Sequence, residues 1–401
     1  MLRPVVLRFL LSSALLPSAR AQVAPACRPT IVANQIVATA TQRESAGDAA
    51  EPPLTDQTNG FAWPDTPFGV IKTDEGYAFF ASDGALHSRQ QWQGHSYGNN
   101  KFGSITRTLG TLANPLGAAP AIDVTLQGNP DPAVNPAFQS YDYIGGGPVY
   151  KVPAGHAGAG NLLLVYHAEI PTVKTQSFYS VLGLASSTDS GLSWTDLGEV
   201  IRVNQAYRTD LDGFDIGDSS LVLSPDGKYF YLFFPDWRAN GTTHWGDTVT
   251  SISAARAAID AVLQAAFGPK PHAIGFQKFY DGWDLAQGLG GYSKDLDTQT
   301  PYGGNLQVAY NTDLKIYQLL INAGVVVYYT DSPDGLHWSP LQLLHDFRNE
   351  KDQPSVTVTF AGMGDDPRAL GREFYIFYTR YPNNGVGWSG ASVNRFTVSC
   401  Q

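Results

Sequence analysis

Long hydrophobic runs are almost absent from this 401-residue sequence. After residue 21, no stretch reaches the roughly 18 apolar residues that a membrane-spanning helix needs. The chain opens MLRPVVLRFLLSSALLPSARAQ, in which Arg3 and Arg8 accompany an apolar stretch and Ala19–Ala21 forms an A-x-A cleavage site. This pattern predicts a signal peptide over residues 1–21. We therefore expect an exported protein without a membrane anchor, secreted or, in a bacterium, periplasmic.

Basic residues are also scarce. The chain has 26 Lys and Arg against 36 Asp and Glu, and loss of the three arginines of the leader leaves a net charge of −13. Such a charge repels nucleic acid and anionic membranes. The low charged fraction of 15% and the many Tyr, Phe, Trp and Gly residues suit an extracellular protein that handles neutral, hydroxyl-rich ligands.

Several motifs with a known chemistry are missing. The sequence contains no HExxH, no Gly-x-Ser-x-Gly, no P-loop and no dinucleotide fingerprint, and its eight histidines lack the spacing of a zinc site. These absences disfavour the corresponding zinc proteases, serine hydrolases, nucleotide-binding enzymes and dehydrogenases. No metal site is predicted from the spacing of the residues.

Only two cysteines occur, Cys27 and Cys400, near the two ends of the chain. In an oxidising compartment a pair is expected to be bridged, and a bridge would make the two termini neighbours. The alternative is two unpaired thiols.

A short, turn-rich phrase is present twice. SSTDSGLSW spans residues 186–194 and TDSPDGLHW spans residues 330–338. Asp and Ser bond their own backbone in turns, and Gly supplies a positive φ. We expect Asp189 and Asp334 to close such turns, with Trp194 and Trp338 buried beside them. The phrase predicts a repeated hairpin and no catalytic role.

A longer pattern recurs five times: a strand, a turn and an aromatic-rich strand. The copies span residues 63–82, 144–169, 215–236, 301–322 and 352–380. Turns such as TDEG and SPDG are strong hairpin signals, and third and fourth strands follow the pairs. Four-stranded units repeated around an axis form a β-propeller. The sequence therefore predicts an all-β, five-bladed β-propeller of four-stranded antiparallel blades, closed by the Cys27–Cys400 bridge.

One helix is predicted, over residues 254–268 (AARAAIDAVLQAAFG), with Gly268-Pro269 as its stop. We interpret it as an insertion in the third blade, on the rim of the propeller. Residues 22–401 are predicted to form a single catalytic domain.

The beginnings of the innermost strands mark the expected site, because these strands converge on the axis of a propeller. Candidate acids lie there and at the ends of the strands that fold back beside them. Asp65, in FAWPDTPFGV, heads the first innermost strand, and Asp83 follows the returning strand. The alternative for each is an ordinary turn aspartate.

Three further acids belong to the next two blades. Glu169 closes the apolar strand LLLVYHAE, where loss of water would raise the pKa of its carboxyl as a general acid requires. Pairing with a neighbouring Arg or Lys is the alternative for Glu169. Asp215 and Asp218, in GFDIGDSS, lie where the third blade begins. Several acids in one funnel are what glycoside hydrolysis needs, since one carboxyl protonates the leaving oxygen while another attacks or activates water.

Aromatic, histidine and amide side chains supply stacking faces and neutral donors for sugars. A solvated loop is an equally good interpretation of residues 95–110. The candidate substrate-binding residues are Trp63, His95, Tyr97, Asn100, His167, His244, Trp245, Trp283 and Tyr302.

The first-blade pattern, an Asp at the start of the innermost strand and then FFASD after an aromatic strand, resembles the propeller hydrolases formerly called domain of unknown function 4185. These are now glycoside hydrolase family 183, endo-D-arabinanases that use two such acids. The likeness covers about 50 residues, and here Ser82 and Gly84 flank the second Asp where that family more often has Gly and Thr. More broadly the chain resembles family 43-type five-bladed glycosidases. That resemblance implies an acidic set of Asp65, Glu169 and Asp215 or Asp218.

These observations together predict a secreted glycosidase acting on a neutral or furanosidic polysaccharide or its oligosaccharides, arabinan-like as a first choice. A non-catalytic carbohydrate-binding propeller is one alternative, and a polysaccharide lyase with a basic cleft is another. Sialidases share the Asp-turns, but they need three arginines in the funnel, and no Arg heads an innermost strand here. We expect a monomer that requires no cofactor, although an axial channel rich in oxygen ligands is compatible with a structural calcium ion.

Overall fold

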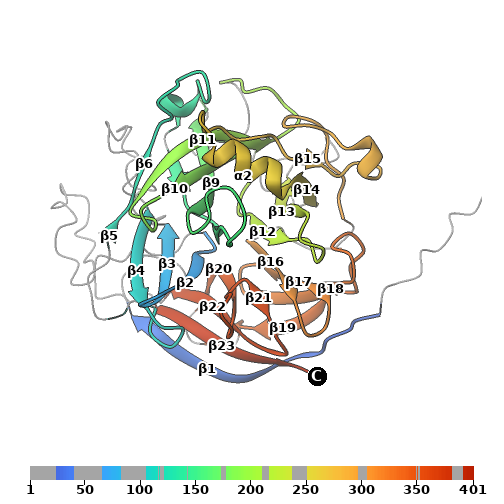
Figure 1. Cartoon of the computed structure of the whole chain (residues 1–401). Coiled ribbons are helices and arrows are strands. Elements are labelled where there is room, and N and C mark those ends of the chain that lie inside the picture. The colour runs from blue at the N-terminus through green and yellow to red at the C-terminus, as the bar shows by residue number, and fades with distance from the viewer. Residues whose placement is uncertain are drawn as a thin grey trace, which may run out of the picture.

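The structure is a computed structural model of the chain. It describes residues 24–39, 66–82, 105–115, 117, 122–141, 143–172, 178–209, 216–236, 251–296, 305–348, 350, 353–381 and 392–401. Five small, mainly antiparallel sheets form a ring around one axis (Figure 1). The predicted five-bladed β-propeller is therefore confirmed.

In the first three blades the strands follow the chain from the axis outward, with one exception at the outer edge of blade two. Blade one consists of β2 (Gly69–Thr73), β3 (Gly76–Ser82), β4 (Ile105–Gly110) and β5 (Ile122–Asp123). In blade two, β7 (Tyr143–Gly145) and β8 (Val149–Lys151) both pair with β9 (Leu162–Pro171), followed by β10 (Phe178–Ser187), β11 (Ser193–Arg202) and the parallel edge strand β6 (Thr125–Gln127). Blade three consists of β12 (Ser220–Leu223), β13 (Tyr229–Asp236), β14 (Ser251–Ala258) and β15 (Gln277–Lys278).

The last two blades complete the ring. Blade four consists of β16 (Leu306–Asn311), β17 (Ile316–Asn322), β18 (Val326–Ser332) and β19 (Gln342–Asp346), with β21 (Ala369–Leu370) added parallel to β16. Blade five consists of β20 (Gln353–Gly362), β22 (Glu373–Tyr381), β23 (Ser392–Cys400) and, outermost, β1 (Pro29–Thr39). We call the face of the ring where the innermost strands begin the front face, and the opposite one the back face.

The fourth strand of blade five comes from the start of the chain, which the sequence did not reveal. β1 runs antiparallel to β23, from the Pro29–Cys400 pair to the Thr39–Ser392 pair. Residues 29–39 carry no hairpin turn to a neighbouring strand, so the repeated pattern could not identify them. The ring is therefore closed by pairing the two ends of the chain, as Figure 1 shows along its lower edge.

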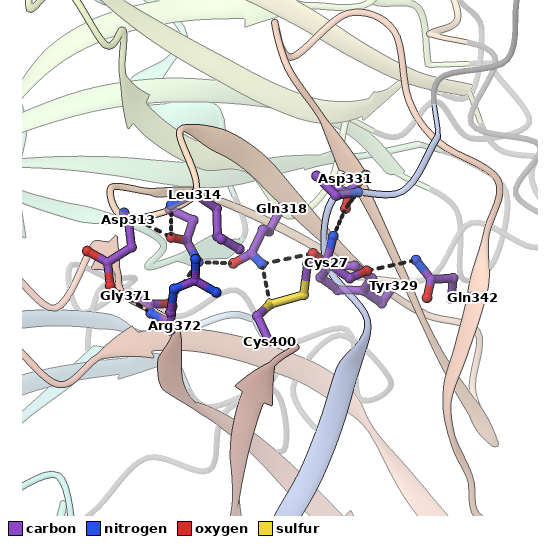
Figure 2. The surroundings of a disulfide bond; sticks show 12 residues. Cys27, Asp313, Leu314, Gln318, Tyr329, Asp331, Gln342, Gly371, Arg372 and Cys400 are labelled. Carbon is purple, nitrogen blue, oxygen red and sulfur yellow. Dashed lines mark hydrogen bonds between the residues drawn. A yellow bond between two sulfur atoms is a disulfide. The ribbon is translucent and has the colours of Figure 1, made fainter.

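The predicted Cys27–Cys400 disulfide is present, with the two Cα atoms 5.2 Å apart. Buried Gln318 of blade four donates from Nε2 to the sulfur of Cys400 (3.1 Å) and to the hydroxyl of Tyr329 (2.8 Å). The carboxylate of Asp331 accepts a hydrogen bond from the backbone N–H of Cys27 (2.9 Å). Figure 2 shows these contacts around the bridge, which fasten the N-terminal segment to blade four as well as to blade five.

The single predicted helix exists but begins later than predicted. Residues 251–258 form strand β14, and the helix α2 covers only Ile259–Phe267. Ala254, Ala255 and Ala257 have high helix propensity, yet each pairs with an aromatic or Leu residue of β13. Tertiary pairing therefore overrides local propensity, and the helix starts only where β14 ends.

The repeated phrase forms a turn that packs against the preceding blade. The carboxylate of Asp189 accepts hydrogen bonds from the backbone N–H groups of Leu192 (3.1 Å) and Ser193 (3.0 Å). Trp194 is buried and meets Phe80 of blade one edge to face, with ring centroids 5.7 Å apart. The prediction that this phrase is structural is confirmed for the first copy.

The second copy repeats the arrangement in blade four. Asp334 accepts from the backbone N–H groups of Leu336 and His337 (both 2.9 Å). Trp338 meets Phe233 of blade three edge to face at 6.1 Å. Each phrase thus joins its own blade to the one before it.

Among the described residues, no helix has both the length and the apolar character needed to cross a membrane.

Removal of the disulfide should weaken the closure of the ring. We expect Cys27→Ser with Cys400→Ser to lower the free energy of unfolding by about 2–5 kcal/mol, because the bridge restricts the unfolded chain over nearly its whole length. Urea denaturation of both proteins without reductant measures the difference. Two free thiols in the intact parent, or an unchanged unfolding midpoint in the variant, would contradict this expectation.

Loss of a turn carboxylate should affect stability alone. Burial by itself would raise the pKa of Asp189, but hydrogen bonds from Ser193, Ser187 and Leu192 outweigh it and hold the pKa below its usual value. We expect Asp189→Ala to cost about 1–2 kcal/mol of stability, since it leaves these donors unpaired. Turnover per folded molecule should stay at the parental value. Asp74→Ala, in an exposed hairpin turn, is the control, and a folded Asp189→Ala protein without activity would overturn the structural assignment.

Candidate functional site

The axis of the ring is a narrow channel formed by all five blades. Its cavity measures about 40 Å³. It is lined by Phe68–Val70 (blade one), Pro148 and Val149 (blade two), Ser220 and Leu221 (blade three), Gln307–Ala309 (blade four), Thr359 and Phe360 (blade five), and Pro367 and Arg368 from the loop after β20. All five blades therefore contribute to one axial cavity.

Arg368 closes the channel on the back face. Its guanidinium pairs with the carboxylate of Asp366 and lies over the ring of Tyr150, 4.1 Å from the ring centroid. Arg368 also lines a second pocket, of about 640 Å³, on the back face, where Lys72 pairs with Asp365.

Ser and Thr hydroxyls join the blades where the innermost strands begin. These hydrogen bonds run from Thr66 Oγ1 to the Gly146 carbonyl (2.7 Å), from the Phe68 N–H to Thr359 Oγ1 (3.1 Å), from the Val308 N–H to Ser220 Oγ (2.9 Å) and from the Ile216 N–H to Ser180 Oγ (2.6 Å). Each one fixes the start of one blade against its neighbour. The front of the axis is thus held by defined contacts.

Glu169 lies on this front face, near the end of β9. It pairs with Tyr143 of the innermost strand β7 and with Ser180 of β10. Only 9% of the residue is exposed. Glu169 therefore lies beside the start of blade two, and its catalytic role stays a prediction.

Asp218 belongs to the same region but to the next blade. It stands two residues after Ile216, whose N–H donates to Ser180, the cross-strand partner of Glu169. Asp218 is 8% exposed and immediately precedes the buried residues Ser219 and Ser220. Two carboxylates from adjacent blades thus lie at the seam between blades two and three.

His167 lies on the same face of β9 as Glu169, two residues earlier. Its Nε2 is 3.9 Å from Oε1 of Glu169, and its ring meets Tyr143 edge to face at 5.9 Å. Burial lowers the pKa of His167 to about 4. His167 is therefore a neutral imidazole near neutral pH, so its contact with Glu169 is not an ion pair.

Asp236 is a front-face acid that the sequence analysis missed. It ends β13 of blade three, and Glu169 lies near the end of β9 of blade two, so the shared signal is an acid late in an apolar second strand. Asp236 is buried, accepts a hydrogen bond from Ser293 Oγ and lies 3.8 Å from Nζ of Lys278. Burial lowers the pKa of Lys278, and attraction by Asp236 partly offsets this effect. Asp236 therefore has a structural partner.

Trp283 is half-buried and is held by its neighbours. The guanidinium of Arg256 covers its ring at 4.1 Å, and Phe279 meets it edge to face at 5.1 Å. Trp283 thus anchors its own segment, and its role in substrate binding stays a prediction.

The remaining candidates lie outside the described residues. They are the acids Asp65, Asp83 and Asp215 and the ligand-binding candidates Trp63, His95, Tyr97, Asn100, His244, Trp245 and Tyr302. Residues 105–110 of the proposed substrate loop form strand β4. Asp65 directly precedes Thr66, which bonds Gly146 of blade two.

Metal binding has little support among the residues that the structure describes. No group of three or more His, Cys, Asp or Glu side chains there is arranged to hold an ion. The channel lining offers neutral oxygens from Ser220, Gln307 and Thr359 and no carboxylate within the described part of the chain. A structural calcium ion stays a prediction.

The buried histidine predicts a loss of stability in mild acid. Between pH 6.5 and 4 the unfolded chain binds a proton at His167 and the folded chain does not, so the free energy of unfolding falls as the pH is lowered. The contribution is up to about 3 kcal/mol. His167→Gln should reduce this slope, as measured by urea denaturation at pH 4.5 and pH 7. Identical slopes in parent and variant would contradict the burial of a neutral imidazole.

No family model matches this chain, and no curated protein sequence matches it either. Membership of glycoside hydrolase family 183 therefore stays a prediction.

Solved structures with a similar arrangement exist at low sequence identity. A structure described as a putative exo-β-1,3-galactanase from Bifidobacterium bifidum s17 is 15% identical, with 91% of this chain and 96% of that chain covered and a TM-score of 0.45. Zg3597, a family 117 glycoside hydrolase from Zobellia galactanivorans, is 11% identical over 86% and 87% of the two chains (TM-score 0.47). An α-L-arabinofuranosidase from Lactobacillus brevis is 13% identical over 84% and 92% (TM-score 0.46). Likeness at this level concerns the overall arrangement alone and carries no activity over to this chain.

Proposed function

We propose that this chain is a secreted glycoside hydrolase that cleaves a neutral or furanosidic polysaccharide, with an arabinan-like polymer as the first choice. The observation that carries the proposal is that Glu169 of blade two and Asp218 of blade three both lie on the front face, each near the start of its innermost strand. These carboxylates come from adjacent blades and are both nearly buried. Carboxyl groups from different elements at the mouth of one closed channel are the groups that hydrolysis of a glycosidic bond requires.

The chemistry divides between an acid and a base. One carboxyl gives its proton to the leaving oxygen, and the other attacks the anomeric carbon or activates a water molecule. We assign Asp65 as nucleophile or base and Asp83 as the acid, with Glu169 as the rival acid. Two observations support Glu169 as an acid: it lies near the start of blade two, and its carboxyl group is next to the neutral imidazole of His167. Asp215 and Asp218 complete the proposed acidic set.

The charge of the chain favours a neutral substrate. The sequence carries a net charge of −10, and no Arg stands at the start of an innermost strand. A polyanionic substrate would require cationic partners at the front of the axis. We therefore place arabinan and related neutral polymers before acidic glycans, propose no required cofactor, and expect the chain to act as a monomer outside the cytoplasm.

Neutralising the proposed catalytic carboxyls should abolish hydrolysis without unfolding the protein. We expect Asp65→Asn and Asp83→Asn each to reduce turnover by at least about a hundredfold, the lower end for loss of a general acid or base, and Glu169→Gln tests the rival acid. Sugar release is measured on a panel of plant, fungal and mycobacterial polysaccharides, and then on the best substrate. Glu373→Gln, an exposed carboxyl where β22 begins on the back face, is the matched control.

Three outcomes separate the alternatives. Parental activity in Asp65→Asn would make Asp65 a turn residue, and parental activity in Glu169→Gln would leave Asp83 as the acid. Retention of a polysaccharide by the parent without any sugar release would replace the hydrolase with a carbohydrate-binding propeller.

A further inference from the structure

A pair of exposed tyrosines lies on the rim of blade three, far from the axis. Tyr280 and Tyr292 are 41% and 52% exposed, and their ring centroids are 6.0 Å apart with the ring planes inclined by 36°. Both belong to the segment Phe279–Leu296 that follows β15, drawn in orange at the outer edge of the ring in Figure 1. We call these two side chains the tyrosine platform.

The platform stands on a fixed support. Buried Lys278 donates from Nζ to the carbonyl oxygens of Arg202 (2.6 Å) and Gly291 (2.9 Å), which ties the residue before Tyr292 to the base of the segment. The backbone N–H of Lys294 donates to the carbonyl of Phe279 (2.9 Å), directly beside Tyr280. These bonds hold the stretches that carry the two rings against each other, so little ordering of the segment would be needed on binding.

A second anchor lies beneath the same segment. Trp283 is held between Arg256 and Phe279, and Ser293 donates to the buried carboxylate of Asp236. The aromatic residue that the sequence indicated is therefore the support, and its exposed neighbours carry the free faces.

The charges around the platform are few and negative in sum. Asp281, next to Tyr280, lies 3.5 Å from Nζ of Lys294, two residues after Tyr292. Asp284 adds one exposed carboxylate. A site of this charge in an acidic protein does not suit a polyanion, whereas tyrosine rings with exposed hydroxyls suit an uncharged, hydroxyl-rich ligand.

The segment is fastened to the front end of its blade. The N–H of Leu296 donates to the carbonyl of Ile252 (2.9 Å), and Ser253 Oγ donates to the carbonyl of Lys294 (3.2 Å). Ile252 and Ser253 belong to the start of β14, which begins on the front face beside the end of β13. The platform and the axial carboxylates therefore belong to the same side of the propeller.

We propose that the tyrosine platform is a second carbohydrate-binding site, which holds a neutral polysaccharide chain at the rim while another part of the chain reaches the axis. This inference rests on the proposed function for its ligand class. Its energetics are those of stacking, in which each sugar ring covers an aromatic face that is otherwise exposed to water. Short substrates that fill only the axial site would not contact the platform.

Affinity electrophoresis tests the proposal directly. Native gels containing sugar-beet arabinan, larch arabinogalactan or oat β-glucan should retard the parent, and polygalacturonate should not. Tyr280→Ala with Tyr292→Ala should weaken the retention at least about fivefold, as expected for loss of two stacking faces. Leu285→Ala is the matched control, since Leu285 is a 55% exposed apolar side chain of the same segment without an aromatic face.

The outcomes distinguish the platform from the axial site. Unchanged retention in the double tyrosine variant, or no retention of the parent by any of the three neutral polymers, would overturn the proposal. A parent that is a dimer in light scattering, with a double tyrosine variant that is a monomer, would instead indicate that the two tyrosines contact a second copy of the chain. Turnover of a short oligosaccharide of the best substrate should be unaffected in the variant, whereas Asp65→Asn should lose turnover and keep the retention. Loss of hydrolysis and loss of binding are thereby measured separately.

Discussion

Closure of the ring is the constraint on which the rest of the structure depends. An open array of four blades and a fragment would expose the edges of its terminal sheets. Here β1 supplies the outermost strand of blade five by pairing with β23, and the Cys27–Cys400 bridge joins the beginning of one strand to the end of the other. Asp331 and Gln318 then fasten this joint to blade four. The angle between blades, and with it the width of the axial channel, can be constant only when this last contact is made.

Between neighbouring blades, a recurring contact sets the spacing. A tryptophan from an Asp-closed turn meets a phenylalanine of the preceding blade: Trp194 with Phe80, and Trp338 with Phe233. Glycines of the same turns, Gly191 and Gly335, adopt positive φ values of 85° and 76° and approach the same two phenylalanines. A side chain at Gly191 would clash with Phe80, so the turn needs glycine for its backbone and for its packing. The Asp-turn phrase therefore occurs twice in the sequence because each copy makes the same tryptophan–phenylalanine contact between two blades.

The architecture could be predicted from the sequence where the information is local. Hairpin turns, alternating apolar strands and the two turn phrases all act over fewer than about twenty residues, and they determined the blade number. β1 escaped prediction because its partner β23 lies at the other end of the chain, and the early start assigned to the helix came from alanines whose propensity is overridden by pairing with β13. The surroundings of Trp283 were equally hidden from the sequence, since the Arg256 guanidinium that lies over its ring comes from a neighbouring strand.

The candidate site shows most clearly why position alone does not define function. Glu169 and Asp236 close the second strands of adjacent blades, and both are buried carboxylates on the front face. Asp236 lies beside the ammonium group of Lys278, which β15 supplies from the outer edge of blade three, some forty residues later in the chain. Ser180, the cross-strand partner of Glu169, accepts the Ile216 N–H and so fixes the start of blade three against the strands that carry Glu169. A buried carboxylate beside a buried ammonium group serves the framework, because each charge compensates the other for the water that it has lost. Asp236 is therefore assigned to the framework by its partner, and an acid at the end of a second strand needs more than its place in the repeat to be a catalytic candidate.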